Sequence, residues 1–162
     1  MSPATRWKLP PTAKVYEAFS AVADGRVHLS GTGRAEVESS GRDKSYTVEW
    51  SDDLTAVAAN DNASYWQGYL GYPAVAVLLV VGALQADEAV VGLLAGVPWH
   101  ELNAHFKRDY QAAVESVLES LEEQGTERAR VVGEVESVMA QLSALALERP
   151  ARSRRPPQAH RP

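Results

Sequence analysis

The sequence contains no cysteine among its 162 residues. This absence excludes a disulfide scaffold, a zinc site built from thiolates and a cysteine nucleophile. It is typical of a reducing compartment, so we expect the protein to be cytoplasmic. The first eight residues also lack the apolar core of about 7–15 residues that defines a secretory signal peptide.

Long uninterrupted hydrophobic runs are missing as well. Residues 65–84 carry Gln67 as their one clearly polar side chain, and the stretch has the length of a membrane span, roughly 20 residues. However, three glycines and Pro73 interrupt it, and no basic residues flank it to give the positive-inside signal of a membrane helix. We therefore predict a buried core helix here and no membrane partner.

Positive charge is scarce except at the C-terminus. The net charge is −5, and residues 149–162 hold five arginines and no acid, so residues 1–148 alone carry −10. Such an acidic body repels nucleic acid at long range. The Arg149–Pro162 segment is rich in proline and has no large apolar side chain, which predicts a disordered tail. Nucleic acid is expected to bind only through this tail, if the tail is more than a solvated extension.

The hydrophobic periodicity predicts an α+β fold. After an irregular lead-in of residues 1–11, apolar residues recur at helical spacing from Ala13 to Asp24, which indicates a short amphipathic helix. Period-two alternation bounded by Gly, Ser and Asp turns then predicts a three- to four-stranded antiparallel meander. The alternating segments are 27–29, 35–37, 46–50 and 54–58. We expect one domain over residues 12–148, with a C-terminal helical half covering one face of the sheet.

The chain after Asn60 is predicted to be helical. Ser64 and Gln67 have the spacing of a capping box, in which two side chains satisfy free backbone N–H groups at a helix start. Asp87 is predicted to cap a short helix over residues 88–95, because aspartate oxygens accept bonds from the first turn.

Two longer helices are expected to follow. Pro98 suits the first turn of a helix that we expect to continue to Gln124. Thr126 is predicted to cap a last helix ending near Glu148. The apolar residues of this helix are spaced alternately four and three apart, as in a heptad seam: Val131, Val135, Val138, Leu142 and Leu145. The seam extends over about two heptads, so it predicts either a helical hairpin or an interface with a second copy or another protein.

The first candidate site precedes the predicted helices. Asn60, Asp61 and Asn62 are followed closely by Tyr65 and Trp66. Short polar side chains beside aromatic ones are typical of a small-molecule pocket. The same polar residues are also preferred in helix caps and turns, and the aromatic residues have the spacing of a core. A ligand site and a structural loop are therefore both open.

The second candidate lies in the first turns of the helix expected after residue 98. His100 and His105 are five residues apart, which puts them about 140° apart on a helix, so we expect no metal site. A helical projection places Asn103 on the apolar face, with His105 and Asp109 at its edge. A buried amide without partners costs about 1–3 kcal/mol. We therefore predict that Asn103 contacts residues 60–62.

These patterns favour a binding protein over an enzyme, with no cofactor. The leading hypothesis is a non-enzymatic binding or protein-interaction module that acts through the C-terminal helices or the aromatic segment. The alternative is a small enzyme or ligand-binding protein with a polar and aromatic pocket between residues 60–62 and 99–110. A further alternative is a nucleic-acid accessory protein that acts through the arginine-rich tail.

Overall fold

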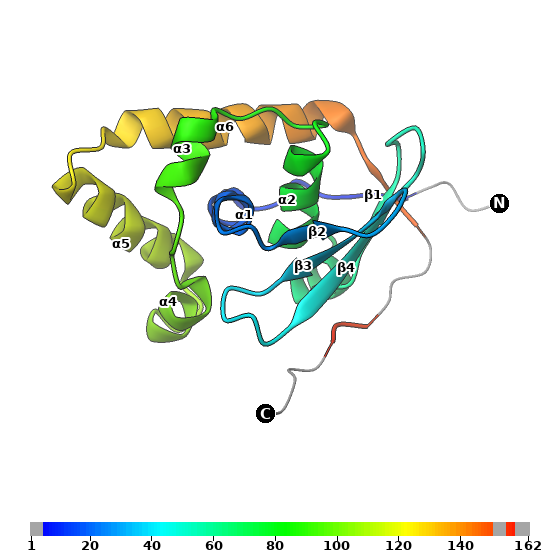
Figure 1. Ribbon diagram of the computed structural model, residues 1–162, viewed down its shortest axis with the longest axis horizontal. Coiled ribbons are helices and arrows are strands. Elements are labelled where there is room, and N and C mark those ends of the chain that lie inside the picture. Colours follow the sequence, from blue (N-terminus) through cyan, green and yellow to red (C-terminus); the bar gives the residue numbers. More distant parts are fainter. Residues whose placement is uncertain (1–4, 151–154, 158–162) are drawn as a thin grey trace.

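The computed structural model describes residues 5–150 and 155–157 (Figure 1). It confirms an α+β fold with an antiparallel four-stranded sheet. The strands are β1 (Thr5–Arg6), β2 (Val27–Leu29), β3 (Arg34–Glu38), β4 (Ser45–Trp50), β5 (Val57–Ala59) and β6 (Glu148–Arg149). The helices are α1 (Ala13–Ala23), the π-helix η1 (Ala63–Gln67), α2 (Tyr72–Val80), α3 (Glu88–Leu93), α4 (Trp99–His105), α5 (Tyr110–Glu123) and α6 (Arg128–Leu145). Most of the tail predicted over residues 149–162 lies outside the described residues.

The main sheet has the strand order β2-β3-β4-β5, and each neighbouring pair is antiparallel. Alternate residues such as Ala35 and its partner Val48 are fully buried, because they point to the face that the helices cover. β5 begins at Val57, three residues later than predicted. The Ser51 hydroxyl and the Asp53 carboxylate accept hydrogen bonds from the backbone that follows them, and these bonds hold a turn where the strand was expected.

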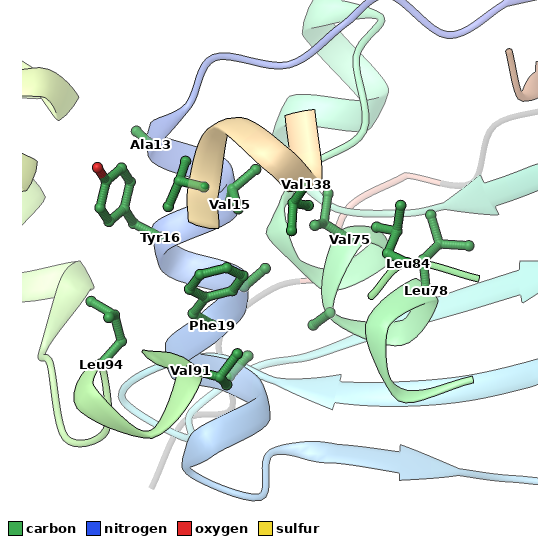
Figure 2. Close-up of a cluster of buried hydrophobic side chains, with 14 of the residues drawn as sticks. Ala13, Val15, Tyr16, Phe19, Val75, Leu78, Leu84, Val91, Leu94 and Val138 are labelled. Carbon is green, nitrogen blue, oxygen red and sulfur yellow. The ribbon is translucent and has the colours of Figure 1, made fainter. Parts of the chain in front are cut away.

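The centre of the core is α1. Figure 1 shows this helix end-on, with helices around it. α2 contacts α1 on one side and strands β2 to β5 on the other, whereas α3, α5 and α6 contact α1. Every residue from Ala13 to Ala21 is buried, so the helix predicted to be amphipathic has almost no solvent-facing side. Figure 2 shows its Val15 and Phe19 among side chains of the other helices, and burying each such side chain stabilises the fold by about 1.5–3 kcal/mol.

The helix expected from residue 98 to 124 is two helices, α4 and α5. Lys107 and Arg108 interrupt it, because both have left-handed backbones with φ of 52° and 67°. The side chain of Asp109 then accepts a hydrogen bond from the N–H of Ala112 at 3.0 Å and caps α5. The single long helix was therefore a wrong prediction, and Asp109 is a helix cap.

Of the three helix caps predicted from the sequence, one is confirmed and two differ from the structure. The predicted cap by Asp87 is confirmed, because its Oδ1 accepts from the Ala89 N–H at 2.8 Å. Ser64 does not start a capping box: its hydroxyl donates to a carboxylate, and residues 63–67 form a π-helix. The N-cap of α6 is Glu127, one residue after the predicted Thr126.

The lead-in contains a short strand, although residues 1–11 were expected to be irregular. β1 pairs with β6, with Thr5 opposite Arg149 and Arg6 opposite Glu148. Nε1 of Trp7 donates to the carbonyl of Val57 at 2.8 Å. The two ends of the described domain are therefore attached to each other and to the edge of the main sheet.

Candidate functional site

A stripe of polar side chains runs along the buried helix α1. Lys14, Glu17 and Ser20 are spaced three residues apart, so they lie on one side of the helix. Their exposed fractions are 8%, 4% and 0%. Charged side chains are rarely buried unless they are paired. The groups that contact this stripe are therefore the place to look for a site.

Lys14 and Glu17 form an ion pair inside the protein. Nζ of Lys14 is 3.3 Å from Oε2 of Glu17 and 4.3 Å from the centre of the Tyr110 ring. Burial lowers the pKa of the Lys14 ammonium, but Glu17 and Tyr110 more than offset this effect, so the pKa is raised above its usual value. Lys14 is therefore positively charged at physiological pH.

Glu17 is also held from α4. Nδ2 of Asn103 donates to Oε1 of Glu17 at 2.8 Å. The second oxygens of both residues are buried: Glu17 Oε2 is ion-paired with Lys14, whereas Asn103 Oδ1 accepts no hydrogen bond from the described residues. An unsatisfied buried acceptor costs about 1–3 kcal/mol. This place is therefore suited to a water molecule or to a ligand that brings hydrogen-bond donors.

Asp61 lies between β5 and η1 and is 5% exposed. Its Oδ1 accepts from the Ser64 hydroxyl at 2.6 Å, and its Oδ2 accepts from the Ser64 N–H at 3.2 Å. Burial raises the pKa of Asp61, while the bonds from Ser64 and the positive charge of Lys14 offset part of the effect. Asp61 therefore belongs to the same electrostatic neighbourhood as Lys14 and Glu17.

The start of α2 is fitted to this carboxylate. The N–H of Gly71 donates to the Ser64 hydroxyl oxygen at 3.1 Å. A Cβ atom added at Gly71 would collide with the Asp61 side chain. Glycine at this position therefore allows the backbone to lie against the buried carboxylate.

Two tyrosines lie beside Asp61. The rings of Tyr46 and Tyr72 meet edge to face with centroids 6.2 Å apart. Burial raises the pKa of Tyr46 to about 12, and the negative charge of Asp61 adds to the effect. The pKa of Tyr72 is also raised, mainly by burial. Both hydroxyls are therefore neutral at physiological pH. We call Lys14, Glu17, Tyr46, Asp61, Tyr72 and Asn103 the buried polar network.

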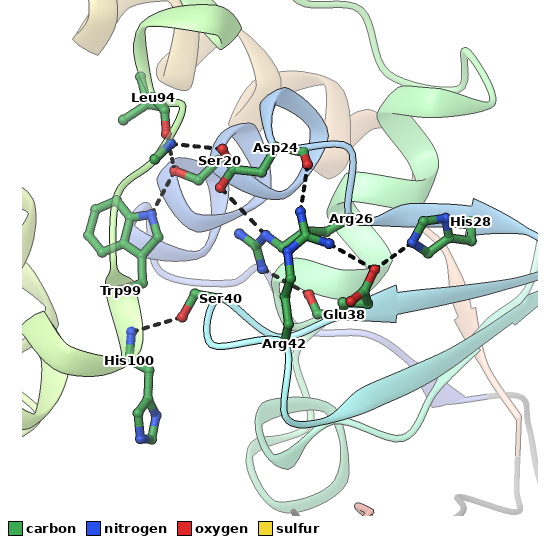
Figure 3. Close-up of polar contacts among 11 residues, drawn as sticks. Ser20, Asp24, Arg26, His28, Glu38, Ser40, Arg42, Leu94, Trp99 and His100 are labelled. Carbon is green, nitrogen blue, oxygen red and sulfur yellow. Dashed lines mark hydrogen bonds and ion pairs between the residues drawn. The ribbon is translucent and has the colours of Figure 1, made fainter. Parts of the chain in front are cut away.

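Further polar contacts attach α4 to the rest of the protein (Figure 3). Nε1 of Trp99 donates to Oγ of Ser20 at 2.7 Å, and this hydroxyl donates to the carbonyl of Leu94 at 2.6 Å. The His100 N–H donates to Oγ of Ser40 at 3.1 Å. α4 therefore lies over the polar side of α1, and side-chain hydrogen bonds carry much of the contact.

The comparisons with known proteins bear on the region that holds this network. The sequence model of one protein family matches residues 7–148, which include the whole buried polar network. The chain belongs to this family. The family is described as Uncharacterised conserved protein UCP014422. No curated protein and no solved structure matches the chain.

Within residues 5–150 and 155–157, the structure has neither a cluster of metal-binding side chains nor a membrane-spanning helix. No group of three or more histidine, aspartate or glutamate side chains is placed to hold a metal ion. In the same residues, no helix has the length and apolar character to cross a membrane.

The structure places the predicted site residues in different environments. Asp61 and Asn103 both belong to the buried polar network, but Asn103 is bonded to Glu17 rather than to residues 60–62. Oδ1 of Asn60 instead accepts from the Thr47 N–H at 2.7 Å, beside the end of β5.

The other predicted ligand-site residues lie nearer the surface. Asn62 is exposed. Tyr65 and Trp66 meet edge to face with ring centroids 4.6 Å apart, and Trp66 is 70% exposed. His105 and Asp109 are exposed on the α4–α5 side, where the His105 ring contacts its neighbour Phe106. The structure does not bring these residues into the network.

The heptad seam of α6 is mostly core. Val131, Val135, Val138 and Leu142 are buried with 0–7% exposed, and Figure 2 shows Val138 beside α1. A partner cannot reach these four side chains in the folded protein. Leu145, at the end of the helix, is 36% exposed and is accessible.

Sequence reasoning missed Lys14, Glu17, Tyr46 and Tyr72. One signal was present in the α1 segment, AlaLysValTyrGluAlaPheSerAlaValAla, which has only two charged residues in eleven. A helix with so narrow a polar side is typical of a buried position.

The surface also has two hollows away from the network. The lead-in cleft has a volume of about 250 Å³ and is lined by residues 6–10, Leu70, Leu142, Ser143, Ala146 and Leu147. The outer-sheet groove has a volume of about 880 Å³ and is lined by Thr32, Gly33, Thr47, Glu49, Trp50, Ser51, Ala56, Ala58, Ala59, Asn60 and Pro150.

Proposed function

We propose that this protein is a non-enzymatic binding protein for a small polar molecule, and that the buried polar network is its ligand site. The observation that carries the proposal is the buried Asn103 Oδ1, which accepts no hydrogen bond from the described residues, together with the buried Glu17 Oε2, which is ion-paired with Lys14 at 3.3 Å but without the geometry of a hydrogen bond. They lie next to the buried charge of Lys14. Clusters of buried groups with perturbed pKa values are frequent at functional sites.

The chemistry of these atoms defines the ligand class. Asn103 Oδ1 and Glu17 Oε2 are both acceptors, so the ligand must bring N–H or O–H donors. Small amides, amino alcohols and polyols have such donors. The ligand would enter where α4 covers α1, since Asn103 of α4 bonds Glu17 of α1. Lys107 and Arg108, directly after α4, both have left-handed backbones. This conformation is strained and persists only where the rest of the structure holds it.

The test is a binding screen with the full chain. Amides, amino alcohols and polyols are added one at a time, the shift in melting temperature is recorded, and hits are measured by titration calorimetry. The Glu17→Gln variant keeps an acceptor for Asn103 but can present an NH2 group in place of Oε2. Because a hydrogen bond to a charged group contributes about 1.5–3 kcal/mol, we expect this variant to bind about 10- to 100-fold more weakly.

The matched control is His105→Gln, a change at an exposed residue outside the network. It should bind each hit with the affinity of the unmodified chain. The proposal fails if no compound of these classes binds, or if Glu17→Gln binds the hits as tightly as the unmodified protein does.

A second candidate function is protein interaction through Trp66. This side chain is 70% exposed, and large exposed aromatic residues frequently anchor interfaces. Leu9 and Leu145, at the lead-in cleft and the end of α6, are also exposed. For a second copy as partner, sedimentation of the unmodified chain should depend on concentration, and Trp66→Ala should remove that dependence. Identical, concentration-independent sedimentation of both chains excludes self-association through this residue.

A further inference from the structure

The lead-in cleft lies where the two ends of the described domain meet. Residues 6–10 line one side of it, and the end of α6 with the turn that follows lines the other. The Trp7 N–H donates to the carbonyl of Leu147 at 3.0 Å, and the Lys8 N–H donates to the carbonyl of Gly68 at 3.0 Å. These backbone bonds fix the extended lead-in beside the end of α6, so the cleft has a defined shape.

Apolar side chains form most of the cleft. Leu70, Leu142 and Leu147 line it and are buried, so they form its floor, whereas Leu9 lines it and is 51% exposed. The volume of about 250 Å³ is below the range of pockets that enclose whole small molecules, about 300–1,000 Å³. The cleft is therefore suited to one or two apolar side chains of a larger partner, in the way that interface anchors fill pockets.

Positive charge surrounds the cleft, although the chain as a whole carries −5. Arg6 and Lys8 are the charged residues that line it, and both are exposed. Neither side chain forms an ion pair with a described residue. Glu148 lies opposite Arg6 in the β1–β6 register, and the next residue, Arg149, holds its guanidinium carbon 4.8 Å from the centre of the Trp7 ring. Three cations and one carboxylate leave a positive excess, which favours a partner with carboxylates.

The end of α6 offers hydrogen-bond acceptors to the same partner. Ala146 has a left-handed backbone with φ of 48°, and no N–H of the described residues after the helix donates back to the carbonyls of residues 142–145. Leu142 and Ser143 of this last turn line the cleft. Uncapped carbonyls at a helix end accept donors and disfavour a free anion. A peptide meets both demands, because its backbone brings N–H groups for the carbonyls while its side chains bring carboxylates for Arg6 and Lys8.

We propose that the lead-in cleft binds an extended acidic peptide segment of a partner protein. One large apolar side chain of the peptide fills the cleft, and carboxylates on either side of it pair with Arg6 and Lys8, since charge-assisted bonds of this kind are the stronger ones. The buried polar network takes no part in this contact, so binding of a small molecule there neither requires nor excludes it.

The experiment selects peptides on the full chain from a phage library of random heptapeptides. The selected sequences should be enriched in aspartate or glutamate beside leucine, phenylalanine or methionine. A fluorescein-labelled synthetic copy is then titrated by anisotropy at about 150 mM salt. Ser143→Trp places a large side chain at an exposed position of the cleft and should lower the affinity at least tenfold. Ser120→Trp, at an exposed position of α5, is the matched control and should bind like the unmodified chain.

Charge is tested with two double variants. Arg6→Gln with Lys8→Gln should weaken binding by about 2- to 25-fold, the effect of two exposed ion pairs. Lys107→Gln with Arg108→Gln removes the same charge at exposed residues outside the cleft and should leave the affinity unchanged. Melting curves of all variants should match that of the unmodified chain, because the replaced side chains are exposed.

Several results would overturn the proposal. The selection might yield no peptide, or peptides without acidic residues. Binding of the selected peptide that survives Ser143→Trp would place the contact elsewhere, and equal losses in the two double variants would reduce it to net charge. If Ser143→Trp instead abolishes concentration-dependent sedimentation of the chain alone and no peptide is selected, the occupant of the cleft is a second copy.

Discussion

The Lys14–Glu17 pair allows a quantitative test of what buried charge contributes to this fold. Replacing Lys14 by methionine leaves the Glu17 carboxylate 4% exposed and without its cation. Removing one partner of a buried ion pair costs about 3–5 kcal/mol, since the remaining charge is uncompensated. A domain of this size has a free energy of unfolding of about 5–15 kcal/mol, so the variant should still fold.

The double variant separates the charge from the packing. Lys14→Met with Glu17→Gln contains neither charge but keeps an acceptor for the 2.8 Å bond from Asn103. Replacing both members of a buried pair is often close to neutral in stability. We therefore expect the double variant to be more stable than Lys14→Met alone, with a coupling energy of about 2 kcal/mol or more.

The assay is urea unfolding at neutral pH, followed by far-UV circular dichroism. The matched control is the pair Arg128–Glu122, whose charged atoms are 2.8 Å apart but whose side chains are 34% and 47% exposed. The same substitutions there should give a coupling energy below about 1 kcal/mol. Equal coupling in the two pairs would refute the reasoning, and so would a Lys14→Met variant more stable than the unmodified chain.

Three further predictions concern single side chains. Folding raises the pKa of Tyr46 from 10.0 to about 12. The free energy of unfolding that this shift contributes is therefore fully present below pH 10 and is lost, by about 2–3 kcal/mol, as pH rises through 12. Urea unfolding of Tyr46→Phe over the same pH range should show a decrease in the free energy of unfolding that is smaller by that amount. Asp109→Ala should lower the free energy of unfolding by about 1 kcal/mol through the lost cap, whereas Asp109→Asn should retain most of it. Val138→Ala should cost about 1–3 kcal/mol because Val138 is fully buried, whereas Leu145→Ala at the exposed helix end should change melting little; equal costs would place both residues in one environment.

Much of the fold was predictable because local signals agreed with the tertiary structure. Alternation and turn residues gave the strands from Val27 to Trp50, and Asp87 marked the start of α3. The break between α4 and α5 could not be predicted in the same way. Lys107 and Arg108 favour helices intrinsically, yet both are exposed and have left-handed backbones, with the Arg108 N–H donating back to the Asn103 carbonyl at 2.8 Å.

The candidate site was less predictable than the fold. Helical projection correctly suggested that Asn103 is turned toward the interior, and Asp61 was singled out as an unusual polar residue. Their partners could not be identified, because Glu17 and Asn103 are 86 residues apart and meet only when α4 covers α1. A lysine and a glutamate three residues apart on a helix usually face solvent. Their burial depends on the surrounding helices, which local periodicity does not describe.

The pairing of β1 with β6 has a consequence for chain connectivity. Thr5 lies opposite Arg149, so the ends of the described domain are neighbours. A short loop could join them and turn a contact between distant parts of the sequence into a local hairpin, which reduces the entropy lost on closing it. New termini could then be opened at the exposed Gly125, between α5 and α6. The architecture therefore permits a circular permutant in which α1 and α6 exchange their order along the chain while the core contacts between them stay the same.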